Sequence, residues 1–416
     1  MSSPRPGAAA RAPSGPGAMI HAFRHRDYRI FWSGALVSNV GSWMQQVAHG
    51  WLVLELTDSA FMLGLVGFAA TFPMLVLLLV GGVYADRFDR RRLLLWANGA
   101  LMASATALAA LTWTGIVEVW HIFVLALVSG IAIALAAPAF QAFVHDLVGT
   151  ENLQNAIALN SAQFNLSRVV GPSLAGMALG AIGLAGCFGV NALSYVAAIG
   201  ALLAIRIRSG PAPDPAPVLE SMKEGVGYVR GHPRILALLS LVALVSVLAM
   251  PYATLLPIIA RDALGLDASG LGYLYAVGGT GAVIGALSLT ARHLFRRRGL
   301  YLLGLAALTG AATAALGLAR TPVAAGAALV VISFAATSAV ALSNTLLQEI
   351  VDDAMRGRVM GMFGLAFMGT FPIGNLVAGA VAGAVSASTT MLLTGTALLA
   401  VSLWIAATRP RLRSVR

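Results

Sequence analysis

Arg168 is a charged residue in the middle of an otherwise apolar stretch, residues 154–181. A cation at such a depth costs about 2.5–3.5 kcal/mol on membrane-insertion scales, so it normally points into a protein interior or a wet cavity. No Asp or Glu falls in the middle of any apolar stretch of the chain. The partners of Arg168 must therefore be polar side chains, backbone carbonyls, water or an anionic ligand. Two roles remain open, ligand binding in a cavity and a structural bridge between helices.

Polar side chains recur at helical spacing in two of the apolar stretches. Spacings of four, three and four place Ser38, Ser42, Gln45 and His49 on one helix face. Around Arg168, two adjacent faces carry Ser161, Asn165 and Arg168, and Asn160, Gln163 and Ser167. In lipid such faces must turn inward. They predict a polar cavity whose candidate substrate-contacting residues are Gln45, His49, Asn160, Gln163 and Arg168.

Three residues near the first polar face are candidate proton sites. Histidine exchanges its proton near neutral pH, so His49 is either a proton carrier or a hydrogen-bonded packing residue. Glu55 and Asp58 follow at the end of the same stretch, where they are alternative proton sites or solvated acids.

The sequence lacks the motifs for ATP hydrolysis, metal binding and nucleophilic catalysis. The chain has no glycine-rich phosphate loop ending in Lys-Ser or Lys-Thr, which argues against hydrolysis of ATP. No His, Cys, Asp and Glu cluster has metal-ligand spacing, and no nucleophile elbow is present. The sequence therefore predicts a protein that is not an enzyme and binds no metal or cofactor.

The composition is that of a membrane protein. Of 416 residues, 58% are hydrophobic and 10% charged, against about 25% charged in soluble domains. The formal net charge of +11 comes from short basic clusters between apolar runs, and no extended basic domain is available for nucleic acid. Apolar runs near 20 residues recur along the chain, each long enough to cross a bilayer core of about 30 Å. We expect an all-α integral membrane fold in a lipid bilayer.

Apolar stretches between charged or Gly/Pro breaks predict twelve membrane spans. They cover residues 30–54, 61–85, 93–113, 121–144, 154–181, 184–206, 234–260, 269–291, 299–319, 322–346, 357–384 and 388–407. An even number of spans puts both termini on one side, and that side would hold 24 of the 27 Lys and Arg residues. The positive-inside rule then places both termini in the cytoplasm of a multi-pass plasma or inner membrane protein.

The longest hydrophilic break divides the chain into two halves of six spans each. Residues 1–26 are expected to be a disordered cytoplasmic tail, and residues 27–206 the first six-helix bundle. Residues 207–233 contain "SGPAPDPAP" and the amphipathic "VLESMKEGVGYVRG", which predict a cytoplasmic linker with a surface helix. Residues 234–416 form the second bundle with a short basic tail.

The two halves show traces of an internal duplication. Residues 141–180 and 344–383 align without a gap, with six identities in 40 positions. Three of these are glycines in matched register, Gly171, Gly176 and Gly180 against Gly374, Gly379 and Gly383, and Asp146 meets Glu349. Such a repeat is typical of transporters that work by alternating access.

One bend concentrates charge at the end of the second span. The segment "GVYADRFDRRRLL", residues 82–94, resembles the signature between spans 2 and 3 of the major facilitator superfamily. The resemblance implies that Gly82 allows close helix contact and that Asp86 faces the start of span 11, whose free N–H groups favour an anion. It would form a cytoplasmic gate from Gly82, Asp86, Arg87, Arg90, Arg91 and Arg358. A purely topogenic bend is the alternative.

A second segment points to a branch of that superfamily. In "SRVVGPSLAG", residues 167–176, Pro172 can bend the helix while Gly171 and Gly176 allow close helix packing. It resembles the Gly-Pro signature of exporters and antiporters, although ordinary packing explains it as well. Together with "GWLVLELTDSAFMLGLVG", residues 50–67, it resembles the branch of enterobactin-type siderophore exporters and macrolide efflux proteins.

The resemblance implies a fold of twelve helices in two pseudo-symmetric six-helix bundles. The implied function is secondary active, proton-coupled export of a small drug-like or siderophore-like molecule by a monomer, through alternating access. An importer of a small nutrient and a nontransporting membrane sensor are the alternatives.

Overall fold

The computed structural model describes residues 21–87, 89–206, 218–288 and 297–408, with side chains described throughout except at 78–87 and 218–222. These residues fold as helices without a strand, which confirms the all-α fold class. The helices are α1 (Arg26–Thr57), α2 (Ala60–Arg87), α3 (Arg90–Trp113), α4 (Val119–Ala204), α5 (Val218–Gly231), α6 (Pro233–Leu248), α7 (Tyr252–Ile258), α8 (Ala268–Ser288), α9 (Arg298–Leu318), α10 (Pro322–Ile350), α11 (Arg356–Gly364), α12 (Phe371–Ala384) and α13 (Ala387–Thr408), with π-helical turns at Ile259–Ala263 and Leu365–Gly369.

The longest helix supplies three of the expected spans. At 86 residues, α4 would run about 130 Å if straight, several times the thickness of a bilayer core. It is instead divided at Gly149 and Gly183, whose φ angles of 69° and 66° lie in the left-handed region that glycine adopts without strain. The described residues contain nine helical stretches long and apolar enough to span a membrane, α4 counted once. With α4 divided and the 32-residue α1 added, the structure is consistent with the twelve predicted spans.

Two spans in the second half are interrupted. The span that begins with α6 continues through α7 into the π-helical turn Ile259–Ala263, and α11 joins α12 through Leu365–Gly369. Pro372 lies in the first turn of α12, where its missing N–H costs no hydrogen bond. Pro172, by contrast, lies inside α4. The related spans of the two halves therefore bend by different means.

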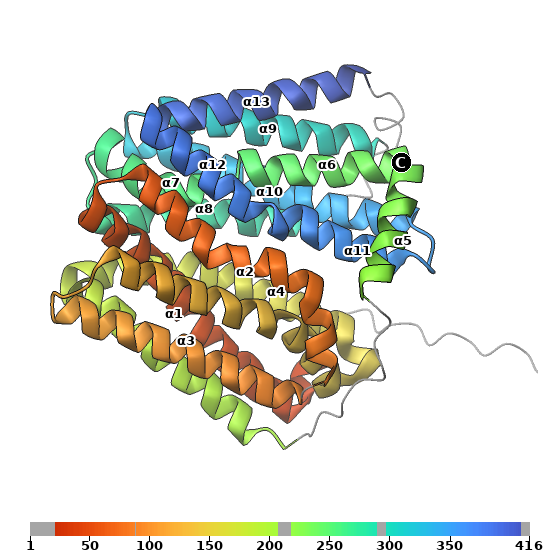
Figure 1. Ribbon diagram of the computed structural model, residues 1–416, viewed down its shortest axis with the longest axis horizontal. Helices are drawn as coiled ribbons and strands as arrows, with labels where there is room; N and C mark the ends of the chain where they lie inside the picture. The colour runs from red at the N-terminus through yellow and green to blue at the C-terminus, as the bar shows by residue number, and fades with distance from the viewer. Residues whose placement is uncertain (1–20, 88, 207–217, 289–296, 409–416) are drawn as a thin grey trace, which may run out of the picture.

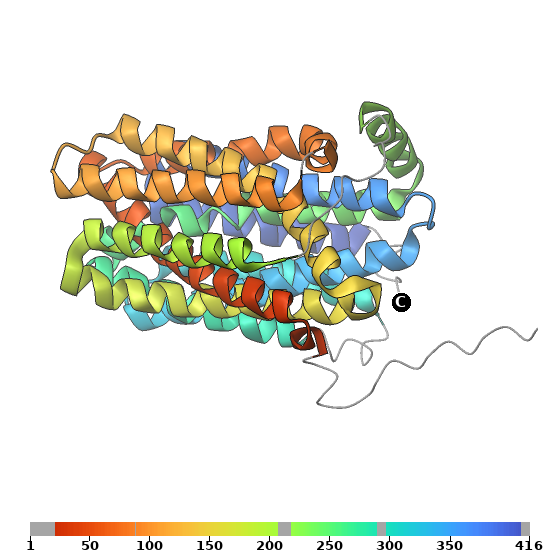
Figure 2. The ribbon, with the colours of Figure 1, turned by 90° about the horizontal axis from the view of Figure 1, so that it is seen from below.

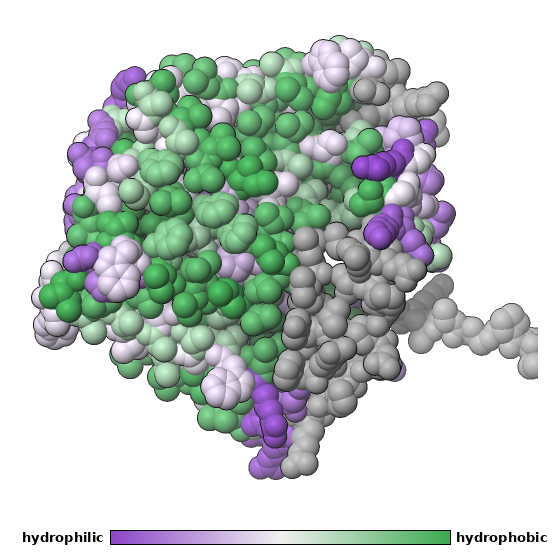
Figure 3. All heavy atoms as spheres, in the orientation of Figure 1, coloured by the Kyte–Doolittle hydropathy of each residue, from purple (hydrophilic) through white to green (hydrophobic). Residues whose placement is uncertain are grey.

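Helices from each half of the chain lie together. In Figure 1, α1–α4 occupy one side and α6–α13 the other, and the turned view in Figure 2 shows their axes running along a common direction. Figure 3 shows a broad hydrophobic band with hydrophilic residues gathered at two opposite edges, the pattern expected of a bilayer-embedded surface. We call these edges the Asp58 end, after the α1–α2 connection, and the arginine-rich end, where α3, α9 and α11 begin at Arg90, Arg298 and Arg356.

The apolar core is shared between the halves at one end and separate at the other. At the Asp58 end, one buried cluster combines first-half residues such as Leu54 and Leu63 with second-half residues such as Leu256 and Ile259. At the arginine-rich end, Tyr28, Phe143 and Leu202 belong to a cluster of the first half alone. A further cluster there, with Leu238, Leu302 and Leu342, contains described residues of the second half and the linker helix α5. Burial of apolar surface therefore holds the halves together at the Asp58 end.

Glycines bring the two halves into backbone contact at the Asp58 end. A Cβ added to Gly64 of α2 would lie 2.6 Å from the Cα of Gly379 of α12, and one added to Gly272 of α8 would lie 2.8 Å from the Cα of Gly176 of α4. The two contacts correspond by the internal repeat, since Gly176 aligns with Gly379, and Gly64 and Gly272 occupy the same place after Ala60 and Ala268, the first residues of their helices. Only a residue without a side chain permits this approach.

We expect Gly64→Val to push the halves apart at the Asp58 end. Overpacking of this kind costs about 1–3 kcal/mol, enough to lower the population of the observed state about tenfold. Spin labels at the exposed residues Ile116 and Val323, one in each half near this end, should report a distance distribution shifted to longer values.

The matched control is Gly99→Val on α3, because nothing lies within 4 Å of a Cβ added at Gly99. Equal distributions for the wild type and Gly64→Val would contradict the assignment of this contact to closure.

Candidate functional site

A central cavity of about 590 Å³ lies between the two halves. Its walls come from α1–α4 on one side and from α7, α8, α10, Leu365–Gly369 and α12 on the other. Three of the residues predicted from sequence line it, namely Gln45, His49 and Arg168. The polar faces of α1 and α4 that carry these three residues therefore both point toward this cavity.

Arg168 connects the two halves across the cavity. Its Nη2 donates a hydrogen bond of 3.1 Å to Tyr252 Oη on α7, and Tyr252 Oη lies 3.2 Å from Ser333 Oγ on α10. The guanidinium carbon lies 5.7 Å from the centre of the Trp43 ring, a cation–π arrangement. Both roles considered for Arg168, ligand binding and helix bridging, are therefore open to the same side chain.

The polar residues of α1 are held by the last segment of α4. Asn191 Nδ2 donates to Gln45 Oε1 at 2.7 Å, and Ser42 Oγ lies 2.9 Å from Tyr195 Oη. Ser194 Oγ donates to Asn191 Oδ1 at 3.0 Å. This chain of hydrogen bonds fixes the orientation of the Gln45 amide beside the cavity.

Asn160 and Gln163 are not among the residues that line the cavity. Asn160 Oδ1 accepts a hydrogen bond of 3.0 Å from Tyr28 Oη, near the start of α1. Gln163 is 2% exposed, and its Nε2 has no hydrogen-bond partner among the described residues. Their face of α4 packs against α1, because Gly171 on the same segment approaches Val40 and Trp43. The adjacent face, which carries Arg168, meets the cavity instead.

Sequence reasoning missed the residues that the second half contributes. Tyr252, Thr254, Tyr275 and Asn375 line the cavity, and Thr254 Oγ1 donates to Asn375 Oδ1 at 2.9 Å. Their stretches look almost uniformly apolar, so no polar stripe marked them. The available signal was the isolated hydroxyl or amide group in each, since a polar group at membrane depth needs a partner.

The Asp58 end is closed by an ion pair between the halves. Arg261, in the π-helical turn after α7, donates through Nη2 to Asp58 and through Nε to Asp262 Oδ1 at 2.6 Å. Asp58 ends α1 with a φ of 47°, a left-handed conformation that Asp tolerates. Glu55 is exposed and accepts a hydrogen bond of 2.7 Å from Trp51 Nε1. The two acids named as alternative proton sites are thus engaged outside the cavity.

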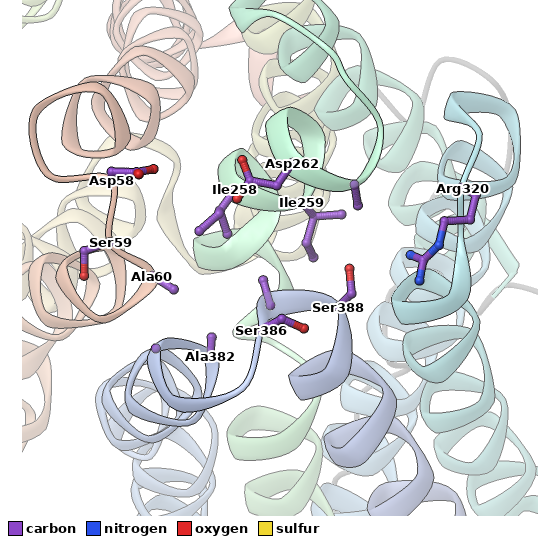
Figure 4. Close-up of a pocket in the computed structure, with 13 residues that line it drawn as sticks. Asp58, Ser59, Ala60, Ile258, Ile259, Asp262, Arg320, Ala382, Ser386 and Ser388 are labelled. Atoms are coloured by element: carbon purple, nitrogen blue, oxygen red, sulfur yellow. The ribbon is translucent and has the colours of Figure 1, made fainter.

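A pocket of about 570 Å³ lies beside this ion pair. Figure 4 shows Asp58 and Ser59 from the first half on one side of it and Arg320 and Ser388 from the second half on the other. The pocket has both polar and apolar walls and lies where the two halves meet at the Asp58 end.

At the arginine-rich end, the described ion pairs remain within one half or its linker. Arg90 binds Asp146 and Arg298 binds Glu349, each with an N–O distance of 2.7 Å, and these pairs correspond by the internal repeat. Arg91 donates to the carbonyls of Leu202 and Leu203 at 2.7 and 2.9 Å, while Arg358 binds Glu224 of α5 at 2.6 Å. Gly82, Asp86 and Arg87 fall in the segment 78–87, whose side chains the structure does not describe, so the predicted contact of Asp86 with span 11 stays a prediction.

The family comparison matches almost the whole chain. A family model described as transmembrane secretion effector matches residues 18–415. The multidrug efflux pump Tap of Mycolicibacterium fortuitum is 28% identical over 403 residues, 92% of this chain and 95% of that protein. The enterobactin exporter EntS of Shigella flexneri is 27% identical over 340 residues, 82% of this chain and 81% of that protein. The staphyloferrin A transporter of Staphylococcus aureus is 26% identical over 232 residues, 56% and 58% of the two chains.

Solved structures share the fold. The nucleoside transporter NupG superposes with a TM-score of 0.76 at 12% identity, covering 92% of this chain and 99% of that one. A bacterial homolog of the human lysosomal transporter Spinster, in an inward-facing and unoccupied conformation, gives a TM-score of 0.70 at 15% identity over 96% and 98% of the chains.

We expect Arg261→Gln to loosen the Asp58 end. In a Cys187→Ala background, a cysteine placed at the buried Ala382, beside the second pocket, reports opening through its rate of maleimide labelling. The Asp58 side chain is 79% exposed, so the pair contributes at most about 1 kcal/mol and labelling should rise about two- to fivefold.

Arg320→Gln is the control, because Arg320 borders the same pocket and, among the described residues, binds only the carbonyl of Ala319, at 3.4 Å. The exchanged pair Asp58→Arg with Arg261→Asp should return labelling toward the starting rate. An unchanged rate in Arg261→Gln would show that the ion pair takes no part in closure.

Proposed function

The chain belongs to the transmembrane secretion effector family of the major facilitator superfamily, and from this premise we propose that it exports a small drug-like or siderophore-like molecule by alternating access. The arginine-rich end and both termini then face the cytoplasm of the inner membrane, as the positive-inside rule requires. Substrate enters the central cavity from that side and leaves at the Asp58 end.

The observation that carries this proposal is the unequal joining of the two halves. They share a core and glycine contacts at the Asp58 end, whereas their described cores at the arginine-rich end are separate. A cavity between two units joined mainly at one end suits an inward-facing state, and opening needs only that joint to separate. The two units are residues 27–206 and 234–416, connected by the linker 207–233.

Within this function, Gln45, His49 and Arg168 contact the substrate, because they line the cavity. We assign the driving proton to His49, since histidine exchanges protons near neutral pH. Binding and release involve no covalent step, so the protein acts as a transporter and not as an enzyme, and one chain contains the whole cavity.

The arginine-rich end closes when the Asp58 end opens. Asp86 then meets the start of α11, where free backbone N–H groups favour a carboxylate. Arg90 and Arg298 tie α3 and α9 to their own halves through Asp146 and Glu349, which keeps each half rigid while the gate forms and breaks.

The chemical panel for the first test follows from the relatives, whose names describe a multidrug efflux pump, an enterobactin exporter and a staphyloferrin A transporter. Everted membrane vesicles containing the chain should accumulate at least one antibiotic or siderophore from such a panel when a proton gradient is imposed. Collapse of the gradient should abolish accumulation, and His49→Gln should uncouple it from the gradient. If no member of the panel accumulates, export is contradicted.

A second test addresses alternating access. In a Cys187→Ala background, Asp58→Cys and Arg261→Cys joined by a short bifunctional methanethiosulfonate should lock the Asp58 end shut. Transport should fall to the background level because substrate cannot leave, and a reducing agent should restore it. Each single cysteine variant treated with the same reagent is the control. Full transport by the cross-linked protein would rule out movement at this joint.

A further inference from the structure

The described charged and titratable side chains that line the central cavity include basic groups but no carboxylate. Among the described residues that line it, Arg168 alone carries a permanent charge, His49 is the other basic group, and none is Asp or Glu. The acids at the Asp58 end are bound elsewhere, because Asp58 and Asp262 pair with Arg261 and Glu55 accepts from Trp51. No described Asp or Glu side chain forms an ion pair with Arg168.

The guanidinium of Arg168 has unused hydrogen-bonding capacity. Of its five N–H groups, one donates to the neutral Tyr252 hydroxyl, and Arg168 donates no other hydrogen bond to the described residues. A planar guanidinium suits a carboxylate, which can accept two parallel hydrogen bonds. Arg168 alone balances a singly charged carboxylate, whereas a doubly charged group needs a second cation, which the described lining supplies only when His49 is protonated.

Aromatic rings form part of the cavity wall. Trp43 lies beside the guanidinium, and Phe164, Tyr275, Phe367 and Phe371 also border the cavity. Such walls favour a flat apolar or aromatic body, since ring faces pack against one another with offset or edge contacts.

From these three observations we propose that the cavity selects small organic monoanions, with a carboxylate on Arg168 and an aromatic or apolar body among the rings. This inference rests on the proposed function for the identification of the cavity as the transport site. The N–H groups that Arg168 does not use for Tyr252 are free to bind the carboxylate, so the ligand would bind the residue that already links the two halves.

The test uses two probes of matched ring system and opposite charge, 2-naphthoate and 2-naphthylmethylammonium. Isothermal titration calorimetry on the full chain in lipid nanodiscs should give a Kd at least about tenfold lower for naphthoate, the usual scale for a hydrogen bond to a charged group. The preference should persist in high salt, which screens exposed charges but not a partly buried one.

Arg168→Gln should abolish the preference, and Arg168→Lys should retain part of it, because the charge remains while the planar fork is lost. Arg320→Gln removes the same charge at the second pocket and should leave the preference intact. Thermal unfolding of each variant establishes that it is folded, and Arg168→Lys supplies the comparison if Arg168→Gln does not fold.

Equal affinities for the two probes, or a naphthoate preference that survives Arg168→Gln or disappears in high salt, would overturn the inference. These outcomes are separate from the export tests. Gradient-driven accumulation of cationic compounds that is unaffected by Arg168→Gln would refute anion selection and leave export standing. Naphthoate binding at Arg168 in a chain that accumulates nothing in vesicles would refute export and leave anion selection standing.

Discussion

The close approach of two helix backbones at glycine is the constraint on which this structure depends. Gly64 against Gly379 and Gly272 against Gly176 bring the halves within a distance that a side chain would prevent. Because the helices meet there, apolar residues of both halves bury one another in a shared cluster at the Asp58 end. These contacts close the central cavity on the side of the Asp58 end. The internal repeat of the chain produces the two glycine contacts as a matched pair. In a transporter, such a contact must pack closely yet contain no strong hydrogen bonds or ion pairs, so that the two halves can separate.

Polar contacts are divided between the two ends according to the same requirement. At the arginine-rich end, Arg90–Asp146 and Arg298–Glu349 hold helices within one half, with the side chains of both arginines partly shielded from solvent. At the Asp58 end, Arg261 bridges the halves through an exposed carboxylate, a type of pair that contributes about 0–1 kcal/mol. Asp262 also pairs with Arg261, so separation of Asp58 alone would leave this cation with a partner. The better shielded of these ion pairs therefore lie within each half, and the more exposed pair lies between the halves.

Arg168 joins the energetics of the fold to the chemistry of the site. Its burial is offset by the Trp43 ring and by the hydroxyl of Tyr252, which are weaker partners than a carboxylate. The remaining capacity of the guanidinium faces a cavity lined by both halves. A single residue of α4 can thus sense the occupant and the position of α7 together.

The sequence by itself determined the helical class and three residues of the cavity wall, Gln45, His49 and Arg168. The length of apolar runs fixes helices in a bilayer, and helical spacing places Gln45 and His49 on one face. The same periodicity could not choose between two adjacent faces of α4, so Arg168 lies at the cavity while Asn160 and Gln163 lie elsewhere. No polar pattern in the sequence marked Tyr252, Tyr275 and Asn375, because each lies in an apolar stretch. The repeat aligned Gly176 with Gly379, but it could not show that these glycines contact Gly272 and Gly64. Periodicity describes one helix at a time, whereas the neighbour of each face is decided by packing between halves that are distant in sequence.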